Sequence, residues 1–347
     1  MPAVTTRVLQ GFDDPSFGPK EWEQLLACGD SDVVFLTWHL QRAWWESFGS
    51  GELMLILAER DGRPIALAPF YTEWQMIFFV ASRRSDYLDF IGDISDPEVL
   101  DALLQAGRDR VLGFQGFRFY CVPGVSHTGK RLKEAGGRLG LECYHSRDIP
   151  APALDMAGQP EVALAAARKK SLVRRENYFR REGSLDIRHF CNGEEVLPHL
   201  DEFFEQSRSR WAATDQPSVL EDETSRMYYR RLTRAAAHTG WLRFTRVDWN
   251  GGPIAFHFGF SYRGRYLFYL HSFAINLANR SPGELLMREL LLAAIREGAA
   301  IFDLGLGDEP YKLRFATHVN EVSTWTLYPS ESAAPEQPAN GLPQGNR

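Results

Sequence analysis

Reactive side chains are most concentrated in the segment 302–315. It contains an aspartate near a strand end, a glycine-x-glycine turn, two further acids, a tyrosine, a lysine and an arginine. Carboxylates, a phenol and an ammonium near a strand end can supply a general base, a general acid and a group that stabilises negative charge. The alternative is a solvated loop held by salt bridges. The candidates for this chemistry are Asp303, Glu309, Tyr311 and Lys312.

A second candidate site is the helix start at Arg280-Ser-Pro-Gly283. Ser281 suits the N-cap, Pro282 suits the first turn, and Gly283 lets a ligand approach the backbone closely. Free amides and the helix dipole at such an end favour a phosphate or pyrophosphate, and Arg280 stands beside them. The alternative is a helix start that binds nothing.

The segment 168–181 is the strongest basic cluster, with seven cations near Glu176 and Glu182. A helix of this kind can hold an anionic substrate, an RNA backbone or a membrane surface. Alternatively it is a solvated helix face whose long side chains cover apolar neighbours. Arg174 and Arg175 are its candidate substrate-binding residues.

Other catalytic motifs are absent from the sequence. There is no Gly-x-Ser-x-Gly, no Cys-x-x-Cys and no His-Glu-x-x-His, so we expect neither a serine nucleophile nor a metal site. The turn at Gly305 lacks a third glycine and is not expected to open a helix, which argues against dinucleotide binding. His257 and His271 are expected to be packed strand residues.

The elements that position these residues follow from hydrophobic periodicity and turn residues. In the C-terminal half we predict helices over 161–182, 196–211, 223–239 and 281–297, and strands over 185–190, 241–249, 253–262, 265–273, 300–304 and 322–328. The N-terminal half is predicted to hold a helix at 38–48 and a hairpin turning at Asp61-Gly62, followed by further strands and helices.

A short sequence pattern occurs in both halves of the chain. Gly62-Arg-Pro-Ile-Ala66 and Gly251-Gly-Pro-Ile-Ala255 each follow an outgoing strand and enter an apolar one. We interpret this as a duplicated unit, although coincidence is the alternative. The predicted fold class is α/β (α+β): two tandem units, each a mixed, largely antiparallel sheet flanked by helices. The predicted domains are residues 1–155 and 156–329, with a disordered tail at 330–347.

Composition limits the partners. The chain has 347 residues and a net charge of −6, which argues against a DNA-binding protein. Its longest unbroken apolar run, from Leu53 to Ala58, is far below the about 20 residues of a membrane span. The start shows no secretory signal, and the four cysteines are scattered. We therefore expect a reduced, cytoplasmic protein.

These segments together resemble the GNAT-related acyltransferases often labelled CelD/BcsL-like, a family similar to the Fem-type aminoacyltransferases that pair two GNAT-like units. The resemblance covers most of the chain up to about Tyr328, and rests on Lys170–Glu182, Trp241–Phe273, Ser281–Leu286, Phe302–Phe315 and the N-terminal stretch from Trp38 to Pro69. It implies transfer of an acyl group from a thioester or ester donor, chiefly acyl-CoA (acetyl-CoA), to an amine or hydroxyl of a small-molecule or glycan acceptor, without a metal.

The resemblance also implies residue roles. In GNAT enzymes an Arg/Gln-x-x-Gly-x-Gly/Ala loop cradles the coenzyme A pyrophosphate; Arg280, Ser281 and Gly283 take that place here, but Leu285 replaces the final small residue. In Fem-type relatives the lysine of a Phe-Lys-x-x-Phe stretch stabilises the oxyanion, which assigns that role to Lys312, with a tyrosine in place of the first phenylalanine.

The remaining roles follow from the same reading. Asp303 or Glu309 would accept the amine proton, and Tyr311 would protonate a leaving thiolate. The acceptor would lie in a groove between the units, walled by Arg174, Arg175 and N-terminal aromatics such as Trp38.

Two alternatives stay open from the sequence. One is a Fem-type enzyme that uses aminoacyl-tRNA, with the basic segment 168–181 on the RNA. The other is a non-catalytic accessory protein, for example in exopolysaccharide production, for which Leu285 is the main argument.

Overall fold

The computed structural model describes residues 3–82, 84–214 and 217–330. All but the first residue of the predicted disordered tail lies outside these ranges. The chain forms two compact units: unit 1 is Met1–Pro150 with the C-terminal strand from Asn320 onward, and unit 2 is Ala151–Val319. Two long strands, β7 (Leu141–Asp155) and β13 (His318–Pro329), each begin in one unit and end in the other.

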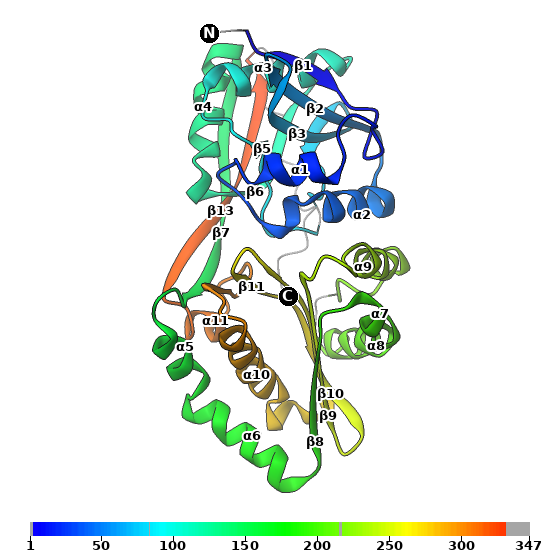
Figure 1. The fold of residues 1–347 in the computed structure, drawn as a ribbon, viewed down its shortest axis with the longest axis vertical. Coiled ribbons are helices and arrows are strands. Elements are labelled where there is room, and N and C mark those ends of the chain that lie inside the picture. The colour runs from blue at the N-terminus through cyan, green and yellow to red at the C-terminus, as the bar shows by residue number, and fades with distance from the viewer. Residues whose placement is uncertain (1–2, 83, 215–216, 331–347) are drawn as a thin grey trace. The chain divides into compact units, whose positions relative to one another are not determined.

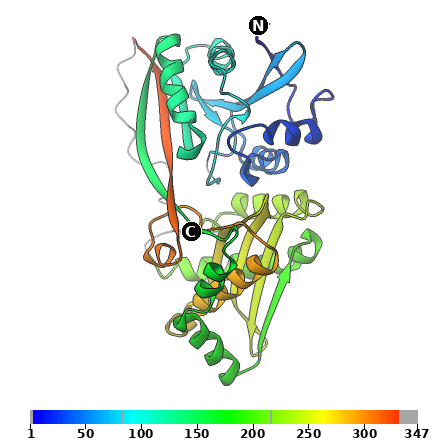
Figure 2. The same cartoon turned by 60° about the vertical axis from the view of Figure 1, so that its left-hand side comes forward.

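Unit 1 has the sheet order β1-β2-β3-β4-β6-β13-β7, and the short β5 pairs with β3 (Figure 1). Helices α1 and α2 pack together, as do α3 and α4, seen again from a second direction in Figure 2. The elements are β1 (Thr5–Val8), α1 (Pro19–Leu26), α2 (Trp38–Phe48), β2 (Glu52–Arg60), β3 (Arg63–Glu73), β4 (Met76–Phe79), β5 (Ile91–Gly92), α3 (Pro97–Arg110), β6 (Gly116–Pro123) and α4 (Thr128–Leu139).

Unit 2 has the sheet order β7-β12-β11-β10-β9-β8. Helix α10 covers one face with α5 and α6 alongside it, and α7, α8 and α9 cover the other face (Figure 1). The elements are α5 (Pro160–Ala167), α6 (Lys170–Glu182), β8 (Leu185–Phe190), α7 (Gly193–Val196), α8 (Leu200–Trp211), α9 (Glu223–Ala235), β9 (Leu242–Trp249), β10 (Gly252–Tyr262), β11 (Arg265–Phe273), α10 (Pro282–Arg296), β12 (Ile301–Asp303) and α11 (Pro310–Leu313).

The two sheets repeat one pairing pattern, which confirms the predicted fold class. In each, antiparallel strands lead to one parallel pair, β4 with β6 and β11 with β12, and an antiparallel strand follows. The two hairpins that carry the repeated sequence pattern also match in detail. Asp61-Gly62 and Asn250-Gly251 all have positive φ, as a type I′ turn requires. Each hairpin then skips one residue of the returning strand, between Pro64 and Ala66 and between Pro253 and Ala255.

The core of unit 2 lies between the sheet and α10. Leu285, Leu286 and Leu290 of α10 are almost fully buried against Ala255, Phe268 and Phe302. Two further residues, Leu172 and Phe179, bring α6 into the same cluster. The apolar stripe of α10 therefore fixes both the sheet face and the basic helix beside it.

Helix boundaries contain the main errors of the sequence analysis. The single helix expected over 161–182 is two helices, because Lys169 adopts an extended backbone (ψ 132°). Its ammonium donates to the Arg314 carbonyl and lies 4.6 Å from the Phe315 ring centre. The helix is interrupted here because these contacts require Lys169 to leave the helical conformation. The helix expected from 196 is likewise divided around Pro198, and β1 and α1 were not predicted.

One buried titratable group makes unit 2 sensitive to acid. His257 of β10 is fully buried, and its ring stacks on Tyr266 and Phe268. Burial lowers the pKa of His257 to about 3, whereas an unfolded chain takes up this proton near pH 6.5. Between these values the unfolded state binds more protons, so stability falls as pH falls.

We therefore predict that His257→Leu makes the dependence of unfolding free energy on pH shallower between pH 6 and 4. This side chain alone contributes about 1.4 kcal/mol per pH unit in that window. Urea denaturation at several pH values measures the slope. His238→Leu is the control, since His238 is exposed. A slope equal to that of the unmodified protein would contradict the assignment.

Candidate active site

The sheet of unit 2 has a narrow opening where β11 extends beyond the end of the neighbouring strand β12. Strand β12 pairs with β11 only from Arg265 to Leu267 and ends at Asp303, whereas β11 continues to Phe273. Strand β11 also carries an extra residue opposite β10, between Leu267 and Leu270. The gap left there is too narrow to hold a water molecule in this structure, and it is lined by Phe268, Tyr269, His271, Leu304, Gly305, Leu306 and Lys312.

Lys312 reaches this cavity from the one-turn helix α11, where the sequence predicted a loop. Its side chain is 2% exposed. Nζ donates to the Leu306 carbonyl at 2.5 Å and lies 2.9 Å from Glu309 Oε2. An ammonium has three N–H groups, so one remains for a ligand. Gly307 (φ 125°) permits this arrangement, because a Cβ there would lie 2.2 Å from Glu309 Oε2.

Two polar atoms beside Lys312 have no hydrogen-bond partner in the described structure. These are the hydroxyl of Tyr311 and Nδ1 of His271, whose rings meet edge to face at 6.2 Å. Burial raises the pKa of Tyr311 above its usual value, so the phenol stays protonated. Burial, together with the charges of Arg210 and Lys312, holds the pKa of His271 well below its usual value, so the imidazole stays neutral.

Asp303 has a different environment from the other three candidates of this segment. Its fully buried carboxylate pairs with Arg265 Nη1 at 2.9 Å and accepts the Gly305 N–H at 2.9 Å. These bonds fix the point at which the chain leaves β12. The structure thus brings Glu309, Tyr311 and Lys312 together and gives Asp303 an anchoring environment.

The predicted anion site lies at the N-terminus of α10. Ser281 occupies the N-cap position, but it has a left-handed backbone (φ 55°) and its side chain makes no capping bond, contrary to expectation. Arg280 is exposed and lies over the Tyr178 ring at 4.9 Å. Gly283 is partly exposed, and Leu285 is buried in the core. The side chain of Leu285 therefore points away from the exposed first turn.

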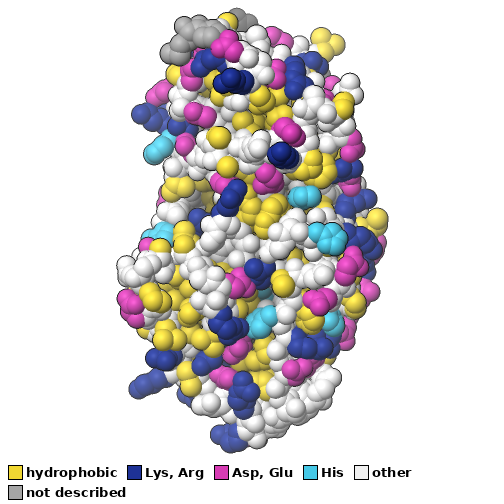
Figure 3. Space-filling model, viewed as in Figure 1, with side chains coloured by type: hydrophobic (Ala, Val, Ile, Leu, Met, Phe, Trp, Pro, Cys, Tyr) yellow, Lys and Arg dark blue, Asp and Glu magenta, His cyan; other side chains and the backbone are white. Residues whose placement is uncertain are grey.

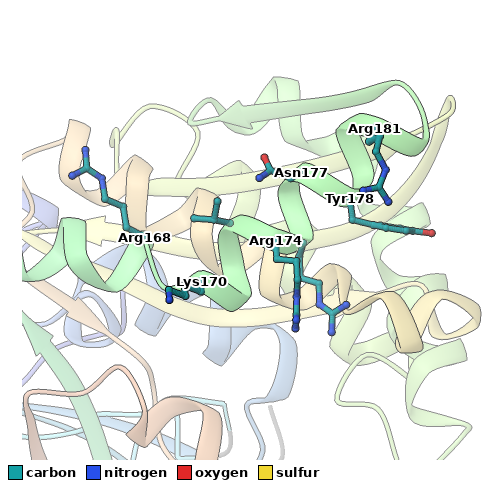
Figure 4. Close-up of a pocket in the computed structure, with 8 residues that line it drawn as sticks. Arg168, Lys170, Arg174, Asn177, Tyr178 and Arg181 are labelled. Atoms are coloured by element: carbon teal, nitrogen blue, oxygen red, sulfur yellow. The ribbon is translucent and has the colours of Figure 1, made fainter.

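A basic groove of about 630 Å³ runs along α6 beside this helix start (Figure 4). Figure 3 shows Lys and Arg side chains gathered over the same part of unit 2. Arg168, Lys170 and Arg174 line the groove and are exposed. Arg175 lies 3.3 Å from Glu284 in the first turn of α10, which joins the groove to the helix start.

The corresponding helix start in unit 1 carries its own negative charge. The Asp96 carboxylate caps α3 by accepting the Glu98 N–H at 2.9 Å, and it pairs with Arg60 at 2.7 Å. The space between β4 and β6 is closed by Phe79 and Phe119, whose rings stack at 4.3 Å. A helix start without a side-chain cap and a gap lined by ionisable side chains therefore occur together in unit 2.

The other predicted residue belongs to unit 1. Trp38 begins α2, where its indole donates to the Phe12 carbonyl at 3.2 Å and Arg42 lies 4.8 Å from its ring. Its role as an acceptor wall stays a prediction.

Two residues of the cavity region were not proposed from the sequence. His271 was expected to be a packed strand residue, and Arg210 was not considered. No spacing or motif distinguishes Arg210 from Arg208, the other arginine of α8. Its distinguishing property, the lack of a carboxylate partner among the described residues, exists only in the folded chain.

Within the described ranges, no group of three or more His, Cys, Asp or Glu side chains could hold a metal ion. Of the helices that the structure describes, none is long and apolar enough to cross a membrane.

Part of the chain matches a known protein family. Residues 166–313 match the family of acetyltransferase (GNAT) domains. The match spans α6, the opening between β11 and β12, and Lys312. A search of curated proteins finds no match.

Solved structures resemble nearly the whole chain. FemX has a TM-score of 0.64 at 11% identity, covering 89% of this chain and 96% of that one. A tandem GNAT protein from the clavulanic acid biosynthesis pathway has a TM-score of 0.51 at 12% identity, covering 95% and 100%. L-PGS from Bacillus licheniformis has a TM-score of 0.50 at 14% identity, covering 84% and 91%. At these identities the likeness establishes the fold, a pair of GNAT-like units.

The two helix starts respond differently to removal of the N-cap side chain. Asp96→Ala removes a capping bond and should lower the unfolding free energy by about 1 kcal/mol. Ser281→Ala should change it little, because that hydroxyl makes no capping bond. Denaturant unfolding of both variants measures the difference. Equal losses would mean that Ser281 caps α10 and is committed to the helix.

Proposed function

We propose that the protein is an acyltransferase of the CelD/BcsL-like kind, which moves an acyl group from acyl-CoA to an amine or hydroxyl of a small-molecule or glycan acceptor. The observation that carries this proposal is the opening between β11 and β12 with the Lys312 ammonium at its edge. The matching GNAT domain supports the reaction class.

Lys312 stabilises negative charge on the acyl oxygen as the acceptor attacks. Its third N–H is available, and its low exposure strengthens the interaction because water does not screen it. The carbonyl of Leu306 and the carboxylate of Glu309 hold the ammonium in place. The thioester of the donor supplies the activated acyl carbon.

Glu309 accepts the proton of the attacking amine, directly or through water. It is partly exposed and lies next to Lys312, whereas Asp303 is engaged with Arg265 and the Gly305 amide. The buried Tyr311 hydroxyl has no hydrogen-bond partner among the described residues, so it is left for a ligand of the site.

The start of α10 holds the donor phosphates. Arg280, the Ser281 hydroxyl and the backbone at Gly283 face a helix N-terminus that favours anions. Leu285 departs from the small residue of the GNAT loop, but its burial in the core leaves the first turn accessible. Arg174 extends the positive surface along the groove of α6.

A second candidate donor is aminoacyl-tRNA. The specific observation in its favour is the row of exposed cations Arg168, Lys170 and Arg174 in the α6 groove. Binding of RNA there would weaken steeply with added salt, in proportion to the phosphates neutralised.

Thermal unfolding with coenzyme A, acetyl-CoA and longer acyl-CoAs tests the donor. At about 100 times its dissociation constant a ligand adds roughly 2.7 kcal/mol to the stability of the folded state. We expect a clear upward shift with one of these donors and a smaller one in Arg280→Gln. No shift with any donor, and salt-sensitive binding of RNA, would favour aminoacyl-tRNA.

Lys312→Met should lower turnover about 10²–10³-fold, as loss of an oxyanion donor does. The shift produced by the donor should persist, because the phosphates bind elsewhere. The control is Lys130→Met, which removes an exposed lysine of α4. Lys312→Met leaves Glu309 without its partner, so Lys312→Met/Glu309→Gln checks that folding is intact. Unchanged turnover in a folded Lys312→Met protein would refute the role.

A further inference from the structure

One cation near the cavity has no counter-charge in the described part of the chain. Arg210 lies at the C-terminal end of α8, and its Nη1 donates to the His271 carbonyl at 3.0 Å. Its guanidinium lies over the rings of Phe273 at 4.5 Å and Trp211 at 5.1 Å. No carboxylate among the described residues lies within ion-pair distance of it.

Arg210 is partly buried, so water hydrates its charge only in part. Taking a charge out of water is unfavourable unless the charge is paired. Burial lowers the pKa of Arg210, yet a guanidinium stays charged at neutral pH. It has five N–H donors, and the bond to His271 uses one. Donors therefore remain for a partner that the described residues do not supply.

The surroundings of Arg210 have excess positive charge and an unused donor. Glu309 is the acidic group that acts on Arg210 electrostatically, and it is already paired with Lys312. Tyr311 also acts on Arg210, and its buried hydroxyl has no hydrogen-bond partner. A guanidinium and a phenol together suit a carboxylate or a phosphate.

We propose that Arg210 and the Tyr311 hydroxyl form an anion subsite that receives a carboxylate or phosphate of the acceptor. The acceptor is then an amine or alcohol that also carries such a group, of the amino-acid or phosphorylated-amine class. The proposal rests on the acyl-transfer function above and specifies its acceptor.

The donor phosphates are assigned to the start of α10, which leaves Arg210 for the acceptor. Helix α8 and helix α10 cover opposite faces of the sheet of unit 2 (Figure 1). The Arg210 side chain nevertheless reaches the Phe273 ring at the end of β11, and the same ring lies 3.5 Å from where a Cβ on Gly283 would stand, so the two anion sites are neighbours.

Isothermal titration with acetate and with inorganic phosphate, in the absence of any donor, tests the subsite. We expect saturable binding of at least one of the two anions to the unmodified protein and its loss in Arg210→Gln. The matched control is Arg208→Gln on the same helix, where the arginine is 48% exposed and paired with Glu205; it should bind as before. The anion that binds more tightly identifies the acceptor group.

Tyr311→Phe provides a second variant that removes only a hydroxyl. It should weaken the anion about tenfold or more, as loss of a hydrogen bond to a charged group does. Binding that is unchanged in Arg210→Gln would overturn the proposal. Binding that disappears in Arg280→Gln but persists in Arg210→Gln would place the anion at α10 and also overturn it.

The test is separate from that of the acyl-transfer function. Arg210→Gln should keep the thermal shift produced by an acyl-CoA, because the donor binds at α10. Anion binding at Arg210 without any donor shift would leave the subsite standing and remove acyl-CoA as the donor. A donor shift without an anion bound at Arg210 would do the reverse.

Discussion

The early end of β12 is the constraint on which the candidate site depends. Had β12 continued alongside β11 beyond Leu267, the backbone of β11 would be paired and no cavity would separate the strands. The Asp303 carboxylate fixes this end through Arg265 and the Gly305 amide. Positive φ at Gly305 and Gly307 then turns the chain so that α11 presents Lys312 to the opening. The Lys312 ammonium can therefore enter the sheet only because β12 is short.

The two units share one backbone arrangement but differ in the side chains at corresponding positions. Both units repeat the same hairpin turns and the same parallel pair, so the backbone alone does not decide where chemistry occurs. Side chains decide it. Stacked Phe79 and Phe119 close the opening in unit 1, and Asp96 places a negative charge where unit 2 has Ser281. A helix start that is already capped by a carboxylate repels the anion that an uncapped one attracts.

Much of this architecture was predictable because it is determined locally. The turns at Asp61-Gly62 and Asn250-Gly251 need residues that tolerate positive φ, and the sequence displays them. Lys312 could be proposed because it falls in a short recognisable stretch. The division between α5 and α6 could not be predicted, because Lys169 leaves the helix for contacts with Arg314 and Phe315, which lie about 145 positions away in the chain. The missing counter-charge of Arg210 is likewise a property of the folded environment that no local pattern records.

That division between α5 and α6 also joins parts of the site that the sequence treats as separate. Lys169 holds the carbonyl of Arg314, which follows α11, while the guanidinium of Arg314 lies 3.1 Å from Glu284 in the first turn of α10. Glu284 in turn pairs with Arg175 of α6. One carboxylate therefore links the basic groove, the start of α10 and the segment that carries Lys312. An anion bound at α10 would compete with Glu284 for Arg175 and Arg314. Because Arg314 is only two residues from Lys312, such competition for Arg314 would also change the position of the lysine.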